Sequence, residues 1–448
     1  MLNTRMPAPQ LHWRQTGMAA LTVVMVLFFV MALGAAYTNR TLILEQRISL
    51  GTYRAAKALE ASEAALNMAM SLMNGGIVDT QCQPSVNPAH NDFRITQYSE
   101  LPADKGIQGA YGPMVGRANG THIVTGCILT DTSLNCSCAI NNVANAAIAQ
   151  PNDGIGSAFH FTTFPPNANA NLPVPGVWGV YGTGCGSLGS GRDDCSKSNG
   201  TPSIPKVDGI ATVALTMGLL RALPLAPVAT LTAGGAVDAA AGRLILSNPD
   251  SASGYTLLSG GAYIAGTNDE FAGPAGSGTE GRRHSISQLG DLAVLADDGW
   301  FKTVFAMNRV DYRTQPATRS INCPGGCDQT HVAAVLAGFP RNPIVLDGNL
   351  TLSDASTLGT AANPVMLVVN GVLTISGNAT VTGFLHADSV VWSANNATLT
   401  GALLTPGPVT VTGTARLRFD RPVIDIVRLR YGSFVRTTGS FNVREGYY

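Results

Sequence analysis

The stretch MAALTVVMVLFFVMALGAAY, residues 18–37, contains no charged side chain and decides how the rest of the chain is placed. At about 1.5 Å of helix per residue, a run of this length spans the roughly 30 Å hydrocarbon core of a bilayer. The sequence therefore predicts a transmembrane helix over residues 18–37.

The charges that flank this run indicate its orientation. Arg5 and Arg14 precede it, whereas Arg40, Glu45 and Arg47 follow it as a mixed group. Basic residues are enriched on the cytoplasmic side of a transmembrane helix. The bias is small, and it places the short N-terminal segment in the cytoplasm and the bulk of the chain outside.

A cleaved signal peptide is the alternative interpretation of this segment. Gly34, Ala35 and Ala36 supply small residues near the end of the apolar run, which would suit a signal peptidase. The run exceeds the roughly 7–15 apolar residues of a usual signal peptide, so we favour a retained helix.

The helical pattern continues beyond the apolar run. Residues 38–74 contain no proline and are rich in Ala, Leu, Met, Glu and Arg, which are good helix formers. Apolar or small residues recur at three- and four-residue steps, at Leu44, Ile48, Gly51, Ala55, Leu59, Ser62, Leu66, Ala69 and Met73. Such a stripe predicts a helix that lies against another part of the molecule. With Gly75 and Gly76 ending it, the helix over residues 18–74 is on the order of 85 Å long.

The composition favours β-structure after the helix. Charged residues make up 12% of the chain, glycine numbers 50, and Thr, Ser, Asn, Ala and Val crowd the second half. These features favour short strands joined by many turns and argue against an all-helical cytosolic enzyme. The formal net charge is zero, so long-range attraction to nucleic acid or acidic lipid is not expected from the charge balance.

The C-terminal part carries an internal repeat. Near-copies that alternate Val, Leu or Ile with Thr or Ser begin at Asn349, Val372, Val390 and Val409, the last three every ~18–19 residues. Stacked coils of a right-handed β-helix, a solenoid, are the expected result. The related stretch 229–266 is expected to contribute earlier coils to the same stack.

The predicted fold class is α+β, with a long N-terminal helix before a β-rich head. We expect a leader at 1–17, the transmembrane helix at 18–37, its amphipathic continuation at 38–74, a loop-rich disulfide-containing β region at 77–205, a β-helix-like domain at 206–430 and a tail at 431–448. A helical insertion is expected at about 285–335. Pro422 and the following VIDIVRLR are expected to cap an open end of the stack, because exposed strand edges invite aggregation.

The eight cysteines lie outside the membrane segment, at Cys82, Cys127, Cys136, Cys138, Cys185, Cys195, Cys323 and Cys327. Their even number indicates disulfides formed in an oxidising compartment. Cysteines one residue apart rarely bridge each other, so one of the three from Cys127 to Cys138 must reach elsewhere, with Cys82 the obvious candidate. Cys185 and Cys195 would close a surface loop, and the spacing leaves the full connectivity open.

Cys323-Pro-Gly-Gly-Cys327, followed by His331, raises a metal site as an alternative to a disulfide. Thiolates and imidazole are ligands that zinc prefers, but the spacing supplies no fourth ligand. A disulfide is therefore favoured here, and no metal is expected.

No catalytic site or cofactor is predicted from the remaining polar residues. Acidic pairs occur at Asp193/Asp194, Asp269/Glu270 and Asp297/Asp298, where they suit solvated loops as well as a glycosidase or a calcium site. Histidines are scattered without a neighbouring nucleophile, at His90, His122, His160, His284, His331 and His386. The arginines of the final segment, from Arg416 to Arg444, are offset by Asp420, Asp425 and Glu445, which favours an ion-paired face over a nucleic-acid patch.

The N-terminal residues resemble a known family. RQTGMAAL, residues 14–21, is similar to a type IV prepilin cleavage junction, with the glycine before the cut and the apolar helix after it. TNRTLILEQR, ALEASEAAL, LMNGG with Cys82 close behind, PVMLVVNGVLTISGNATVTG and GSFVRTTGSF resemble PilX-like minor pilins of type IV pili. The resemblance covers roughly the first 85 and last 110 residues. It implies cleavage between Gly17 and Met18 and incorporation into a pilus.

One position departs from the family pattern. Major pilins carry a glutamate at the fifth mature position, which is Thr22 here if cleavage follows Gly17. In the family that carboxylate neutralises the N-terminal amine of the preceding subunit within lipid, where an unpaired charge costs several kcal/mol. A subunit with threonine can instead be first in line, so the resemblance implies a tip or priming position.

The expected function is that of a minor pilin-like structural subunit, with an exported head that is adhesive and not enzymatic. Its partners would be other minor and major pilins, the prepilin peptidase and the inner-membrane assembly platform, with a surface glycan or DNA as ligand of the head. It would span the inner membrane once, with a periplasmic head, until it joins an extracellular pilus. The alternatives are a tip pseudopilin of a type II secretion system and a membrane-anchored or secreted glycan-binding β-helix protein.

Overall fold

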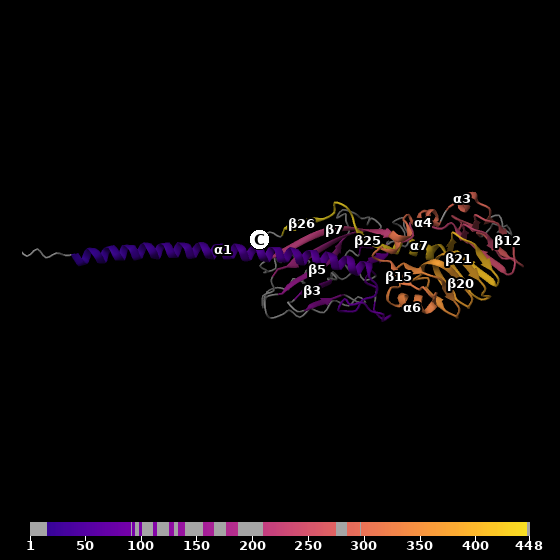
Figure 1. Cartoon of the computed structure of the whole chain (residues 1–448), viewed down its shortest axis with the longest axis horizontal. Helices are drawn as coiled ribbons and strands as arrows, with labels where there is room; N and C mark the ends of the chain where they lie inside the picture. The colour runs from indigo at the N-terminus through magenta and orange to yellow at the C-terminus, as the bar shows by residue number, and fades with distance from the viewer. Residues whose placement is uncertain are drawn as a thin grey trace, which may run out of the picture.

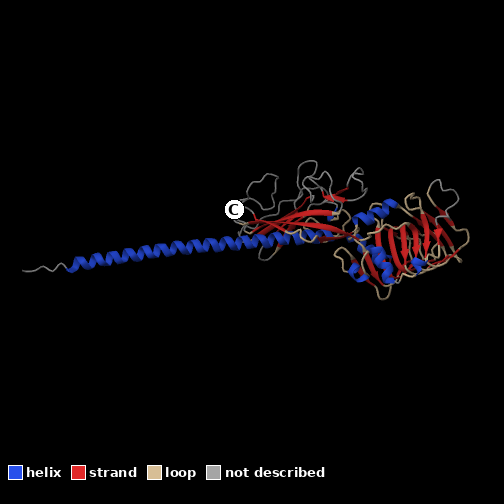
Figure 2. Cartoon of the chain, turned by 90° about the horizontal axis from the view of Figure 1, so that it is seen from above, coloured by secondary structure: helices blue, strands red, loops and turns tan. Residues whose placement is uncertain are grey.

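The computed structural model describes residues 16–90, 92–94, 98–100, 111–113, 125–129, 133–138, 156–164, 176–186, 209–274, 285–295 and 297–445. A long helix, α1 (Thr16–Asn74), leads into a head made of two β-rich bodies (Figure 1). The first body lies beside the C-terminal half of α1, and the second lies beyond the end of the helix (Figure 2). The expected α+β class, a long N-terminal helix before a β-rich head, is confirmed.

α1 is continuous over 59 residues, in agreement with the absence of proline from this part of the chain. The predicted stripe is buried in the second half of the helix, at Ser62, Leu66, Ala69 and Met73. Leu44 and Ile48, from the same stripe, are exposed. The helix is thus covered by its own head only toward its C-terminal end.

The first body is a seven-stranded antiparallel sheet in the order β25-β7-β6-β5-β3-β4, with β26 also pairing with β7. Its strands are β3 (Thr125–Leu129), β4 (Leu134–Ser137), β5 (Ser157–Phe164), β6 (Val177–Cys185), β7 (Ile210–Arg221), β25 (Gly432–Arg436) and β26 (Asn442–Glu445). A separate antiparallel pair joins β1 (Tyr98–Glu100) to β2 (Tyr111–Pro113). The second half of α1 packs across β5, β6, β7 and β25 (Figure 1).

Small residues allow α1 to approach this sheet closely. The helix presents a buried face of Ala58, Ala61, Ser62, Ala65 and Ala69. Glycines of β6 lie opposite: a Cβ on Gly184 would be 2.2 Å from the carbonyl oxygen of Ala58, and one on Gly182 would be 2.5 Å from that of Ser62. Because glycine lacks a Cβ, the backbone of the strand can pack directly on the backbone of the helix.

Polar contacts fix the C-terminal end of α1. Arg94 is 2% exposed, and its Nε donates a hydrogen bond to the carbonyl oxygen of Met73 at 2.6 Å. The Asn74 side chain accepts a hydrogen bond from Phe434 N at 2.7 Å and donates one to Phe434 O at 2.9 Å. The Arg94 bond satisfies a carbonyl that the end of a helix leaves unpaired, and the two Asn74 bonds tie α1 to β25.

Arg319 connects α1 to the second body. Its Nη2 donates a hydrogen bond to the carbonyl oxygen of Asn74 at 2.6 Å, and its guanidinium lies 4.3 Å from the ring centroid of Phe339. Burial, with a further contribution from the charge of Arg94, lowers the pKa of Arg319. A half-buried cation therefore faces the partial negative charge at the C-terminal end of α1.

The second body is a 17-stranded sheet of parallel strands, which coils into a stack. Its strands are β8 (Ala229–Ala233), β9 (Val237–Asp238), β10 (Arg243–Ser247), β11 (Tyr255–Ser259), β12 (Tyr263–Ile264), β13 (Glu270–Ala272), β14 (Ser285–Ile286), β15 (Arg319–Asn322), β16 (Cys327–Asp328), β17 (Ile344–Asp347), β18 (Leu350–Leu352), β19 (Thr357–Leu358), β20 (Val365–Ile375), β21 (Thr380–Trp392), β22 (Thr398–Thr405), β23 (Val409–Val411) and β24 (Thr414–Arg418). Leu373 lies opposite Val390, and Val390 lies opposite Val409. The near-copies in the sequence are therefore neighbours in the stack.

The chain enters this stack in its interior. β8 and β9 pair with β22 and β23, which belong to the last coils of the repeat, and β10 pairs with β24. β11 to β14 continue toward the far end, after which the chain returns to β15 near α1 (Figure 1). Residues 229–266 do belong to the same stack, but they follow its last coil instead of preceding its first.

The stack is an insertion between two neighbouring strands of the antiparallel sheet. β7 leads into it, and α7 (Arg421–Arg430) leads back to β25, which pairs with β7. Two boundaries therefore differ from those expected at 206 and 430. β7 belongs to the first body, and residues 432–445, from the segment expected to form a separate tail, contribute β25 and β26 to that body.

The predicted insertion contains α3 (Gly290–Ala293), α4 (Asp297–Phe305), α5 (Arg309–Arg313) and α6 (Gln329–Gly338), with β15 and β16 before α6. α4 and α5 contribute to a core on the outer face of the coils, whereas Val332 of α6 joins the core inside them. Ile424 and Val427 of α7 join Met366 and Phe384 in a core outside the coils. The expectation that Pro422 and VIDIVRLR cap an end of the stack is wrong, because α7 packs along β21 and β22. These strands are apolar on both faces and need cover on their outward side.

His386 is buried in this outer core. Its side chain is 0% exposed and lies 5.5 and 5.4 Å from the ring centroids of Phe301 and Phe305. Neither ring nitrogen has a hydrogen-bond partner within the described residues. Burial, with a contribution from the charge of Arg309, lowers the pKa of His386 to about 3.

We expect substitution of Gly184 by valine to detach the first body from α1. The new side chain would overlap the carbonyl oxygen of Ala58, at a loss of about 3 kcal/mol or more in the free energy of unfolding. Urea denaturation of the full chain in detergent measures this loss. The control is Gly218→Ala, whose Cβ would meet Thr437 Cγ2 at an ordinary 3.4 Å. Equal stability of the two variants would contradict close backbone packing.

We expect stability to fall in acid through His386. In the unfolded chain His386 is protonated near pH 6.5, whereas in the folded chain it is protonated only near pH 3. The free energy of unfolding therefore keeps its full value above pH 6.5 and decreases as the pH falls from 6.5 to 3. The loss is about 1.4 kcal/mol per pH unit. His386→Phe should flatten this slope between pH 6.5 and 4.5 in thermal unfolding. An unchanged slope in His386→Phe would count against the assignment.

Candidate assembly interface on the N-terminal helix

The N-terminal half of α1 exposes apolar side chains on all sides. Val24, Phe28 and Phe29 are 63%, 75% and 65% exposed, and the described side chains from 20 to 50 are all exposed. Residues 15–39 contain no Asp, Glu, Lys or Arg. Apolar surface in water costs roughly 25 cal/mol per Å², so this surface requires a cover of lipid or of other apolar helices. Its length and composition suit a membrane-spanning helix.

A mixed surface follows between the charge-free segment and the head. Exposed apolar side chains continue there, at Leu42, Ile43, Leu44, Ile48, Leu50 and Tyr53. Arg40, Glu45 and Arg47 lie among them. A helix surface with charges among apolar residues can pack against neighbouring helices in water, where an entirely apolar surface would aggregate.

The predicted processing residues lie at the free end of α1. Gly17 and Met18 are in its first turn, and the side chain of Met18 lies outside the described part of the structure. Thr22, at the position of the usual pilin glutamate, is exposed. The structure thus places the three positions close together on one helix and far from the head (Figure 1).

Sequence reasoning missed the residues that hold the head onto this helix. Gly182 and Gly184 alternate along β6 and so share one face of the strand, which was the available signal of a close backbone approach. Arg94 carried no such signal. Its role arises because the end of α1 and β25 meet around it.

The cysteines form disulfides within each body. Cys127 on β3 is bonded to Cys136 on the neighbouring β4, and Cys82, close behind α1, is bonded to Cys138. Cys185 is also disulfide-bonded, while Cys195 lies outside the described residues. Cross-links of this kind stabilise chiefly by restricting the unfolded chain.

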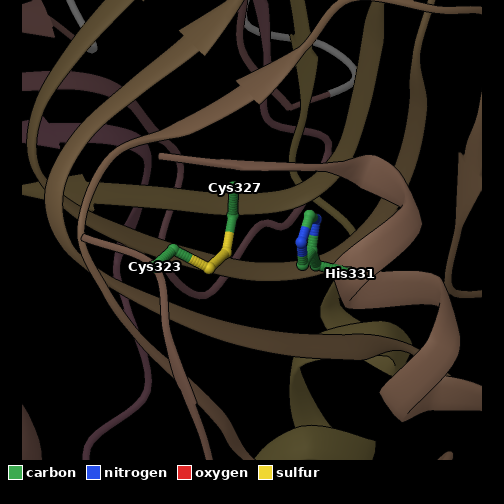
Figure 3. A group of neighbouring side chains, drawn as sticks. All are labelled: Cys323, Cys327 and His331. Atoms are coloured by element: carbon green, nitrogen blue, oxygen red, sulfur yellow. A yellow bond between two sulfur atoms is a disulfide. The ribbon is translucent and has the colours of Figure 1, made fainter. Parts of the chain in front are cut away.

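Cys323, Cys327 and His331 come together in the second body (Figure 3). Their sulfur and ring-nitrogen atoms all lie within 4.8 Å of one another, and the two sulfurs are joined in a disulfide. Asp328 is the N-cap of α6, and its side chain accepts hydrogen bonds from the backbone N–H groups of Thr330 and His331. Hydrogen bonds from the Thr330 hydroxyl and from His331 hold the pKa of the Asp328 carboxyl well below its usual range.

The other polar candidates are dispersed. Asp269 accepts a hydrogen bond from Leu244 N at 2.6 Å and Glu270 pairs with Arg243, so both residues connect β10 to the neighbouring coil that contains β13. Asp193/Asp194, His122 and His284 lie outside the described residues. Among the final arginines, Arg416 and Arg418 are exposed on β24, whereas Arg421 and Arg428 on α7 pair with Asp425 at 2.9 and 3.5 Å.

Comparison with known proteins does not assign the chain to a family. Neither a protein-family model nor a curated protein matches the chain. Among solved structures, the crystal structure of the competence-associated pilin ComZ from Thermus thermophilus aligns with 88% of this chain and 98% of its own, at 11% identity and a TM-score of 0.23. A likeness at this score does not establish a shared fold.

We expect the exposed half of α1 to hold the chain in a membrane. Val26→Asp with Phe29→Asp would place two carboxylates in the span, each at roughly 3 kcal/mol. Carbonate extraction of membranes should then release a large part of the protein into the soluble fraction. The matched control, Val26→Leu with Phe29→Leu, should stay in the membrane pellet. Full retention of the aspartate variant would show that this segment is not the anchor.

Proposed function

We propose that this chain is a minor pilin-like structural subunit of a type IV pilus. The observation that carries the proposal is the exposed apolar half of α1, which continues without a break into a half that is packed on a head. A rod of this kind can lie in a bilayer as a monomer and can exchange lipid for neighbouring rods in a fibre. The likeness of residues 14–21 to a prepilin junction supports the same role.

We infer that the chain is processed between Gly17 and Met18. Before assembly it spans the inner membrane once with its head in the periplasm, and afterwards it is part of an extracellular fibre. Prepilin peptidase, the assembly platform and other minor and major pilins are its partners. Thr22 supports a tip or priming position, because threonine cannot neutralise the amine of a preceding subunit.

We infer that the stack of parallel strands is a right-handed β-helix and that it is the part of the subunit that meets other surfaces. Parallel connections within one sheet are right-handed in the great majority of proteins. The stack also lies at the opposite end of the molecule from the free end of α1 (Figure 1). We propose an adhesive and non-enzymatic role for this body, with a surface glycan or DNA as its ligand, and its distance from the free end of α1 supports the adhesive role (Figure 1).

We expect Gly17→Val to leave an uncleaved precursor in the membrane. The peptidase is expected to require glycine directly before the cleaved bond, and the bulky valine side chain would prevent cleavage. N-terminal sequencing should give Met18 for the wild type, and the variant should be absent from sheared pili. The matched control is Gly34→Val on the same helix, where a Cβ meets nothing within 4 Å and cleavage should proceed.

A mature chain that begins near Tyr37 would mean ordinary signal cleavage and would overturn the proposal. A position at the pilus tip also predicts the amount of this subunit in the fibre. The subunit should occur in sheared pili in a small, fixed ratio to the major subunit. If the chain is cleaved after Gly17 but co-purifies only with secretion-system pseudopilins, it belongs to a secretion pseudopilus and not to a type IV pilus.

A further inference from the structure

The disulfide between Cys323 and Cys327 lies beside an imidazole on a fixed scaffold. Cys327 is in β16, opposite Leu350 of β18, and Cys323 N donates a hydrogen bond to Asp347 O at 3.0 Å. His331 is in the first turn of α6, which begins directly after β16. The backbone positions of the three residues are therefore set by the parallel stack and by the helix cap.

The three donors suit a zinc-type cation. Two cysteine sulfurs and one imidazole nitrogen are the ligands that Zn²⁺ prefers. In a tetrahedral site such atoms lie roughly 3.5–4 Å apart. Here all of them are already within 4.8 Å of one another, and Figure 3 shows the imidazole beside the two sulfurs. Small side-chain rotations would complete the set once the sulfur–sulfur bond is open.

A carboxylate forms a hydrogen bond with one nitrogen of the imidazole. Asp328 Oδ1 lies 2.7 Å from His331 Nδ1. Metal-binding histidines commonly donate their other ring N–H to a carboxylate, which fixes the tautomer and the ring orientation. With Nδ1 engaged in this way, Nε2 is the nitrogen left to bind a cation.

We propose that Cys323, Cys327 and His331 form a redox-gated site for a zinc-type divalent cation, closed by the disulfide and open when the two sulfurs are thiolates. A dithiol reductant supplies two electrons and two protons, which break the bond and give two thiols. Cation binding then releases both protons, and water takes the fourth position. A disulfide oxidant reverses the step, accepting two electrons and returning the cation to solution.

The fold around the site does not depend on the disulfide. The two cysteines are 4 residues apart, and so short a loop restricts the unfolded chain least. α6 has independent attachments, because Gln329 Nε2 donates a hydrogen bond to Asp354 Oδ2 at 2.7 Å and Asp328 caps the helix. The reduced loop can therefore keep its place beside His331.

Cobalt(II), a spectroscopic probe for zinc sites, provides the test in the full chain in detergent. After reduction with a phosphine and its removal, we expect one equivalent of Co²⁺ to bind with visible d–d bands and a thiolate charge-transfer band. The oxidised chain should show neither. Cys323→Ser with Cys327→Ser should abolish the bands, and His331→Asn should weaken binding at least tenfold.

A second variant keeps the test decisive if reduction of the other disulfides unfolds the head. Cys323→His with Cys327→His leaves those disulfides intact and should bind Co²⁺ without reductant through three imidazoles. Bands that persist in the double serine variant, or equal binding by the oxidised chain, would overturn the proposal. So would the absence of binding in both the reduced chain and the histidine variant.

Discussion

Close packing of the α1 backbone on the backbone of β6 is the contact on which the rest of the structure depends. It requires small residues on both partners, Ala58 and Ser62 on the helix and Gly182 and Gly184 on the strand. A head fixed in this way leaves the first half of α1 free on all sides. The same rod thus has one half buried in its own protein and one half that lipid or other helices must cover.

The second body is held by topology as much as by contacts. Because it is inserted between β7 and β25, which pair with each other, both of its connections return to the same place on the antiparallel sheet. Arg94 and Arg319 hold the end of α1 at that junction. The stack is therefore presented at the end of the molecule opposite the apolar segment, an arrangement suited to a protein that is anchored in a membrane at one end.

The sites differ in how far they could be predicted. The exposed apolar surface of α1 could be predicted from composition, because a charge-free apolar run of this length is typical of a membrane-spanning helix. The grouping of Cys323, Cys327 and His331 was visible as spacing, but spacing does not say whether the side chains converge. The burial of His386 carried no sequence signal. It sits on a strand whose outward face would be solvated if α4 and α7 did not cover it.

By itself, the sequence determined the local and periodic features: an unbroken helix, predicted over residues 18–74 and observed over Thr16–Asn74, its apolar first half, and the coils that repeat from Val372 to Val409. These depend on neighbours a few residues apart or on a regular period. The tertiary structure alone decided that residues 229–266 join the stack after its last coil, that α7 covers its side, and that the tail strands return to β7. Pairing between strands distant in sequence depends on which edges and faces remain uncovered in three dimensions, and no local pattern encodes that.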